Sequence, residues 1–214
     1  GQYFTPAYQI LDEKAFVNGI VGLMATGGST NLVLHLPAMA KAAGIKIELS
    51  DFDDISSVTP LMAKIYPNGL ADVNHFHAAG GLNYMISQLL EYGYLHNDVQ
   101  TIMGLGLETY TKEPKLVDGK IEYVPSSTKT HNEKILRPVI DPFQKSGGIK
   151  KLDGNLGTCI IKISSVAAMS REALLAKLNG LFIDTGLEDD HWSLEQTEDQ
   201  LTEYSIAFKG PPRT

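Results

Sequence analysis

The residues best suited to chemistry lie in one seven-residue stretch, Ala25-Thr26-Gly27-Gly28-Ser29-Thr30-Asn31. The stretch follows an apolar run and precedes a helix-like run that begins at Leu32. The two glycines let the backbone approach another group closely, and Ser29 or Thr30 can cap the following helix. N–H groups left free at the start of that helix suit a phosphate or a carboxylate. The pattern is also typical of a capped tight turn that binds no ligand.

The predicted anion site comprises the two glycines and the three residues that follow them: Gly27, Gly28, Ser29, Thr30 and Asn31. The local sequence offers this turn no basic side chain, because the nearest lysines, Lys14 and Lys41, lie more than a helical turn away. We therefore expect an anion to bind through backbone N–H groups and the positive end of the helix dipole.

A close pair of histidines stands in His75-Phe76-His77. On a strand, residues two apart share a face, so both rings could bind one metal ion. The sequence anchors no third ligand nearby, so no metal site is predicted. The pair can instead line a pocket or make structural hydrogen bonds. His35 lies about one helical turn after Asn31 and could face the same pocket, so the pocket-lining candidates are His35, His75 and His77.

The chain has one cysteine, Cys159, in a strand-like run over residues 158–163. A disulfide within the chain is therefore impossible, which fits a reducing, cytoplasmic location. No base is placed near Cys159 in the sequence, so we expect a small buried apolar residue and not a nucleophile.

The elements that must position these residues alternate between helices and short strands, which predicts an α/β fold. Apolar periodicity predicts helices over residues 10–24, 30–43 and 82–90, with Gly44 ending the second. A helical stretch is also expected from Thr59 to Tyr66. Short strands, mostly parallel, are expected. One is predicted at Ile45–Leu49, residues 100–106 are a strand or a loop, and a β-rich segment is expected near 149–163. A short helix is predicted at Ser170–Leu178.

Composition narrows the possible partners. The chain has 214 residues, a hydrophobic content of 43% and a net charge of −7. Nine acidic and four basic residues fall in the last segment, residues 170–214, so the acidity is concentrated there. This charge, without a basic stripe, argues against nucleic-acid binding. No apolar run approaches the roughly 18–20 residues that cross a bilayer, and no secretory signal is visible.

Several motifs together resemble one enzyme family, the iron–sulfur sugar-acid dehydratases, which include dihydroxy-acid dehydratase and 6-phosphogluconate dehydratase. The resemblance is collinear from about Pro6 to Val166 and is greatest for the phosphogluconate branch. Besides the glycine stretch, it rests on residues 12–21, His35–Ile45, Tyr66–Phe76, Ala78–Gly81, Gly104–Leu107, Tyr110–Pro114, Asp141–Phe143, Gly147-Gly148 and Gly154–Gly157.

The resemblance implies a hydro-lyase of the Entner–Doudoroff pathway that converts 6-phosphogluconate to 2-keto-3-deoxy-6-phosphogluconate. For the full enzyme it implies an iron–sulfur cluster, Mg²⁺, a sugar acid phosphate as substrate and a homodimer. A dehydratase for another aldonic or dihydroxy acid is the alternative within the family. Catalytic residues are not identifiable in this chain.

The chain departs from the family in its cysteines. Such a cluster needs about three cysteine thiolates, and in the relatives these precede the matching part, as do the Mg²⁺ ligands. The serine taken as the base lies in a later loop. We therefore expect a fragment, inactive alone and without bound cofactors, or a non-catalytic remnant that binds a sugar acid or a partner chain.

The resemblance also divides the chain into segments. The expected parts are an α/β core of the dehydratase N-terminal domain at 1–111, a polar connecting segment at 112–134 and the start of a β-rich part at 135–166. Residues 167–214 form an acidic tail that matches nothing in the family.

Overall fold

The structure is a computed structural model that describes residues 4–66, 68–155, 157–164, 192–196 and 204–208, the last two ranges by their backbone alone. The chain divides into two compact units, Gly1–Lys162 and Ile163–Thr214. The second unit contains one described hairpin, in which β7 (Trp192–Gln196) pairs antiparallel with β8 (Tyr204–Phe208). The helix predicted at Ser170–Leu178 lies outside the described residues. No helix among the described residues is both long and apolar enough to span a membrane.

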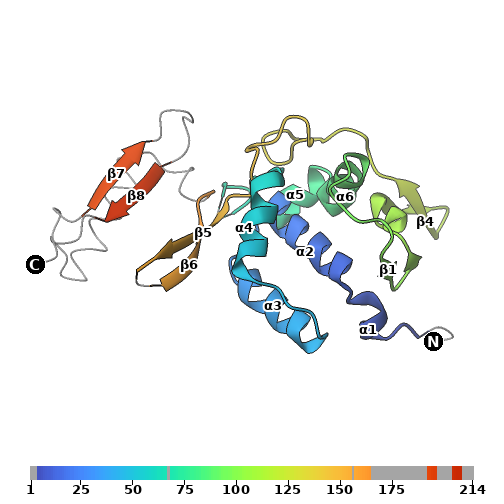
Figure 1. The fold of residues 1–214 in the computed structure, drawn as a ribbon. Coiled ribbons are helices and arrows are strands. Elements are labelled where there is room, and N and C mark those ends of the chain that lie inside the picture. The colour runs from blue at the N-terminus through green and yellow to red at the C-terminus, as the bar shows by residue number, and fades with distance from the viewer. Residues whose placement is uncertain (1–3, 67, 156, 165–191, 197–203, 209–214) are drawn as a thin grey trace, which may run out of the picture. The chain divides into compact units, whose positions relative to one another are not determined.

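The first unit is mainly helical (Figure 1). Its helices confirm the predictions for residues 10–24, 30–43 and 82–90, with boundaries shifted by a few residues. Gly44, at φ 80°, follows the end of the second of these helices, as predicted. In order, the helices are α1 (Ala7–Ile10), α2 (Glu13–Thr26), α3 (Leu32–Ala42), α4 (Leu49–Val58), α5 (Val73–Ala78) and α6 (Gly81–Glu91).

Helix α2 is the centre of this unit, because it contributes to both clusters of buried apolar side chains. Val21 and Ala25 belong to the cluster that includes Tyr84 and Met85 of α6. Neighbouring α2 residues face the other cluster, which also contains Phe52 of α4, Val33 of α3 and Ile149. A helix that packs on two sides is held firmly, and the glycine turn directly follows its last residue, Thr26.

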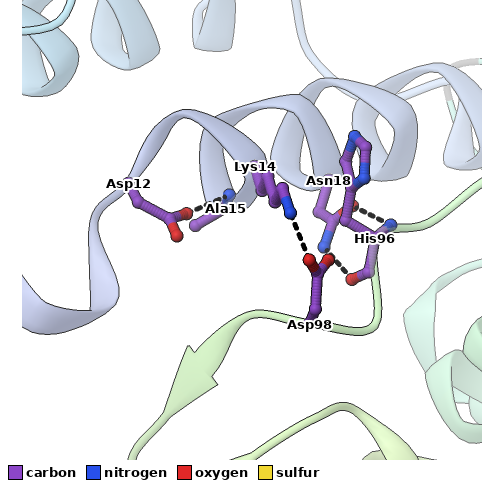
Figure 2. Close-up of polar contacts among 6 residues, drawn as sticks. All are labelled: Asp12, Lys14, Ala15, Asn18, His96 and Asp98. Carbon is purple, nitrogen blue, oxygen red and sulfur yellow. Dashed lines mark hydrogen bonds and ion pairs between the residues drawn. The ribbon is translucent and has the colours of Figure 1, made fainter.

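The start of α2 is tied to the loop that follows α6 (Figure 2). Asp12 caps the helix by accepting a hydrogen bond of 2.8 Å from the Ala15 N–H. The Asn18 side chain exchanges two hydrogen bonds of 2.8 Å with the backbone of His96, and Lys14 pairs with Asp98. The contacts of Asn18 and Lys14 with the loop are exposed, so they orient the loop more than they stabilise the fold.

The stretch from Thr59 to Tyr66 is not a helix, and that prediction is wrong. Its backbone runs extended between two distant segments, forming bridges from Leu61 to Gln144 and from Ala63 to Leu136. The N–H groups of Met62 and Ala63 both donate to the carbonyl of Ala25, at 2.8 and 3.1 Å. Tertiary hydrogen bonds have overridden the local apolar spacing, and Pro60 adds its own bias against a helix in the residue before it.

The strand pairs of the structure are antiparallel, so the expectation of mostly parallel strands is wrong, although the mixed α/β class is confirmed. Each pair joins strands that follow one another in sequence, and such short connections allow only antiparallel pairing. The predicted strand at Ile45–Leu49 does not form. The first unit contains β1 (Gln100–Thr101) with β2 (Gly104–Leu105), β3 (Lys112–Val117) with β4 (Lys120–Pro125), and β5 (Ile149–Gly154) with β6 (Gly157–Lys162). A 3₁₀ helix, η1 (Glu108–Thr111), precedes β3.

The β5–β6 hairpin confirms the β-rich segment predicted near 149–163 and is attached to α4. The Ile149 N–H donates to the Ser56 hydroxyl at 3.2 Å, and the Lys151 N–H donates to a carboxylate oxygen of Asp53 at 3.0 Å. The register pairs buried Ile149 with Lys162, the last residue of β6. This attachment fixes the base of the hairpin against the helices.

Candidate functional site

The glycine turn begins with Gly27 in the left-handed conformation, at φ 60° and ψ 41°. Gly27 is buried, and a Cβ added there would lie 2.1 Å from Nδ2 of Asn68 and 2.8 Å from Cδ1 of Leu61. Both its φ and its lack of space therefore require glycine. Gly28 is not in the left-handed region, and a Cβ there would meet the flexible end of the Leu23 side chain at 2.8 Å.

Neither of the predicted capping residues, Ser29 and Thr30, occupies the cap position of α3, although the Ser29 hydroxyl does accept a backbone N–H near the start of the helix. Asn31 occupies the cap position with helical angles, and its side chain makes no capping hydrogen bond. The Ser29 hydroxyl instead accepts a hydrogen bond of 3.2 Å from the Asn31 N–H, two residues on. Further along, the first N–H groups of α3 donate to carbonyls of the turn itself, as when the Leu32 N–H bonds to Ser29 at 3.1 Å.

Two N–H groups of the turn stay available to an anion. Within the part of the chain that the structure describes, the N–H groups of Ser29 and Thr30 donate no hydrogen bond. Ser29 is exposed and Thr30 is half-buried, so solvent reaches the turn. This is a smaller donor set than a full uncapped helix end, but its two donors are consecutive.

Two donors from distant parts of the chain hold the carbonyl side of the turn. Nδ2 of the buried Asn68 donates to the carbonyl oxygen of Gly27 at 3.0 Å. Nζ of Lys162 donates to the same oxygen at 2.6 Å and to the carbonyl oxygen of Gly28 at 2.9 Å. A basic side chain therefore does contact the turn, from more than a hundred residues away, where local sequence offered none.

The charge of Lys162 has no acidic partner among the described residues, whose ion pairs all involve other lysines, an arginine or a histidine. Partial burial lowers the pKa of the Lys162 ammonium from its ordinary value. The two carbonyls that it contacts lie at the negative end of the α2 dipole, which favours a cation there.

The histidine candidates all lie on helices. His35 is an exposed residue of α3. His75 and His77 lie on α5, so the strand on which they would share a face does not exist. Two positions along a helix rotate a side chain by about 200°, which separates the rings. The structure brings neither His75 nor His77 to the glycine turn through any hydrogen bond among the described residues.

His75 has a local role in the cap of α5. The Asp72 side chain accepts a hydrogen bond of 3.0 Å from the His75 N–H, and the His75 ring returns to Asp72, with Nδ1 2.7 Å from a carboxylate oxygen. The hydrogen bond from the His75 backbone, followed by its ring, lowers the pKa of Asp72. The signal in the sequence is an acidic cap residue three positions before a side chain that can reach back.

Cys159 is exposed on β6, so the prediction that it is buried is wrong. In the register of the hairpin it faces Leu152, which is also exposed. An iron–sulfur cluster needs several thiolates, and this chain has one cysteine. The described residues also contain no group of three or more His, Cys, Asp or Glu side chains placed to hold a metal ion. The residues present do not fit such a cluster.

Comparison with known proteins places the chain among dehydratases. Residues 2–110 match the family described as dihydroxy-acid/6-phosphogluconate dehydratase, N-terminal. The chain is 52% identical over 167 residues to phosphogluconate dehydratase of Rhizobium meliloti, covering 78% of this chain and 28% of that protein. It is 49% identical over 166 residues to phosphogluconate dehydratase of Escherichia coli strain K12, again over 78% of this chain and 28% of the relative.

A more distant match is a dihydroxy-acid dehydratase of Sulfurisphaera tokodaii, 41% identical over 158 residues, which cover 73% of this chain and 26% of that protein. The chain thus spans little more than a quarter of the length of the relatives that it matches.

Proposed function

Because the chain belongs to the dihydroxy-acid/6-phosphogluconate dehydratase family, we propose that it is part of a hydro-lyase that dehydrates 6-phosphogluconate to 2-keto-3-deoxy-6-phosphogluconate. The observation that carries the choice of substrate is the level of identity. It is about one half to two relatives named phosphogluconate dehydratase and 41% to the dihydroxy-acid dehydratase. A substrate of this class has a carboxylate and a phosphate, so its enzyme needs anion-binding groups.

The glycine turn is our candidate for one of these groups, with Gly27, Gly28, Ser29, Thr30 and Asn31 as its residues. Its support is the pair of consecutive N–H groups at Ser29 and Thr30 that donate to no described acceptor. Consecutive backbone N–H groups beside a helix start favour a negative group. The turn could bind either the carboxylate or the phosphate of the substrate.

This chain alone is proposed to be incomplete for catalysis. In the full enzyme, an iron–sulfur cluster and Mg²⁺ would supply Lewis-acid chemistry. Neither has a ligand set in the described residues, and one cysteine cannot replace about three. Cluster and Mg²⁺ ligands would come from other parts of a longer, cytoplasmic and homodimeric enzyme.

Titration of the 214-residue chain with 6-phosphogluconate tests the anion site. Thr30→Pro removes one of the two available N–H groups. Because the Thr30 N–H donates no hydrogen bond among the described residues, its removal breaks none. Thr30→Ala keeps the N–H and serves as the matched control. We expect Thr30→Pro to weaken binding by about tenfold, the effect of one lost hydrogen bond to a charged group. Equal binding by parent, Thr30→Pro and Thr30→Ala would remove the site assignment.

The choice of substrate is tested in the same titration with gluconate and a branched 2,3-dihydroxy acid as competitors. A preference for 6-phosphogluconate supports the phosphogluconate branch. Tighter binding of either competitor would favour the alternative dehydratases of the family, as the relative from Sulfurisphaera tokodaii illustrates.

A second candidate function is a non-catalytic remnant that binds a sugar acid or a partner chain, which the single cysteine favours. The two candidates are separated by comparing the purified chain with a longer form that carries the flanking regions. Both proteins are analysed for iron and sulfide and assayed for dehydration of 6-phosphogluconate. Iron, sulfide and turnover in the longer form alone support an enzyme fragment. Turnover by the 214-residue chain itself would contradict both.

A further inference from the structure

Lys162, the last residue of the first unit in sequence, contacts the glycine turn. It is the last residue of β6, and its pairing partner Ile149 is buried. The hairpin is attached to α4 through the hydrogen bonds of Ile149 and Lys151 to Ser56 and Asp53. The side chain of Lys162 therefore starts from a fixed base, and its ammonium ends within 2.9 Å of two carbonyl oxygens of the turn.

The peptide bond between Gly28 and Ser29 connects that contact to the candidate site. A trans peptide unit is planar, and its carbonyl and its N–H point in opposite directions. The carbonyl of Gly28 and the N–H of Ser29 belong to one such unit. Because Nζ of Lys162 holds the Gly28 oxygen at 2.9 Å, the Ser29 N–H must point away from the lysine.

The preceding peptide unit is fixed on both of its sides. Its carbonyl, from Gly27, accepts hydrogen bonds from Lys162 at 2.6 Å and Asn68 at 3.0 Å, and its N–H, from Gly28, donates to Leu23 at 3.0 Å. The unit that follows, between Gly28 and Ser29, has no such double support. Among the described residues its carbonyl has one donor, Lys162, and its N–H has no acceptor.

We propose that Lys162 is a positioning residue of the glycine turn: by holding the Gly28 carbonyl oxygen it directs the Ser29 N–H toward the anionic group that the turn would bind. The proposal rests on the proposed anion site and adds to it the residue that sets its geometry. Lys162 itself lies on the opposite side of the peptide unit, so it would act through the backbone and not by contact with the anion.

The variants that test this role are Lys162→Met, which removes the donors, and Lys162→Arg, which can still reach both carbonyls with a charged fork. Lys150→Met is the matched control, because it removes one charge from the partner strand of the same hairpin, where Lys150 pairs with Ile161. The probes are 6-phosphogluconate and inorganic phosphate, and the protein is the whole 214-residue chain with backbone ¹⁵N labelling.

We expect Lys162→Met to weaken binding of both probes by about tenfold, as for loss of one well-placed donor. The amide resonances of Ser29 and Thr30 should move in this variant before any probe is added. Lys162→Arg should recover most of the affinity, and Lys150→Met should change neither the affinity nor these two resonances. Unchanged thermal unfolding midpoints in all variants would exclude general loss of the fold as the cause.

Other results would overturn the proposal in distinguishable ways. If Lys162→Met binds as the parent does while Thr30→Pro does not, Lys162 has no positioning role and the anion site stands. If Lys162→Met loses affinity but leaves the Ser29 and Thr30 resonances in place, its charge acts directly and positioning is refuted. If Lys162→Met and Thr30→Pro both bind as the parent does, or the parent shows no binding, the site itself is absent. If Lys162→Met lowers the unfolding midpoint and Lys162→Arg does not restore binding, the contact is structural only.

Discussion

The glycine turn at 27–31 and the histidine segment at 75–77 are both rich in polar groups, yet the fold uses them differently. The carbonyls of the turn are held by side chains 41 and 135 residues away in sequence, from Asn68 and Lys162. The histidine segment satisfies itself locally, through the reciprocal cap between Asp72 and His75. A polar cluster that recruits distant, partly buried donors has its geometry fixed by the whole unit. A cluster that closes within three residues mainly begins a helix.

The largest effect should appear on substitution of Gly27, because its close contact with Asn68 distinguishes the glycine turn from a left-handed glycine in open space. Gly27→Ala places a Cβ against Asn68 in a left-handed conformation, so we expect the free energy of unfolding to fall by about 2–4 kcal/mol. Gly44→Ala is the control, because Gly44 has φ 80° but open space around it, and it should cost only about 1–2 kcal/mol. If chemical denaturation shows equal losses of unfolding free energy for both variants, the contact with Asn68 does not contribute to stability.

The next effect concerns Asn68, which is 2% exposed. Asn68→Ala removes a buried donor to the Gly27 carbonyl and should lower the free energy of unfolding by about 1–3 kcal/mol. His77→Ala, at an exposed position of α5, should change it by less than about 0.5 kcal/mol. The same denaturation measurement checks both, and a loss for His77→Ala as large as that for Asn68→Ala would contradict the contrast drawn between the regions.

A smaller effect is the pH dependence of the α5 cap. The backbone hydrogen bond from His75 lowers the pKa of Asp72 below its ordinary value. The cap therefore stabilises the helix fully above the unfolded pKa of about 3.9, and this stabilisation disappears as the pH falls through the lower folded pKa. The protection of residues 75–78 against amide exchange, relative to the intrinsic exchange rate at each pH, should fall in that acidic range. In Asp72→Asn this fall should be absent, and its persistence would assign it to another carboxylate.

The last prediction is that zinc does not change the stability of the chain through the histidine pair. His75 and His77 project from α5 in different directions, so added Zn²⁺ should leave the thermal unfolding midpoint where it is. The double variant His75→Ala/His77→Ala shows what zinc does elsewhere in the chain. A rise in the midpoint for the parent, lost in the double variant, would restore the histidine pair as a metal site.

Local patterns were sufficient for some elements of this fold. The apolar spacing in Leu82, Met85 and Leu89 predicts α6, which forms with Met85 and Leu89 buried although Leu82 is exposed. The β5–β6 hairpin is likewise visible as a β-rich run. The stretch after Thr59 has a comparable apolar spacing but lies extended, because its backbone bonds to Ala25 and to residues 135–144. No local pattern reports such distant acceptors.

The candidate site shows the same limit. The glycines and the small polar residues after them are recognisable in sequence, and the left-handed angle at Gly27 agrees with their type. Asn68 and Lys162 were not predictable as its partners, because a lysine at the end of a strand is common on surfaces. What the sequence does contain is a basic residue inside an apolar run, Ile160-Ile161-Lys162-Ile163, where a lysine needs a partner.

The pairing of Ile149 with Lys162 also determines which changes in chain length the protein can tolerate. Consecutive residues of a strand face opposite sides, so deleting one residue from β6 would turn Lys162 away from the glycine carbonyls without altering its identity. Additional residues at the hairpin tip, between Gly154 and Gly157, would leave the register intact. A short affinity tag could therefore be inserted at the tip. A one-residue deletion in β6 should have the same effect on the glycine turn as loss of Lys162 itself. A relative with a gap at this strand should therefore lack the contact between the lysine and the turn, even if most other residues are the same.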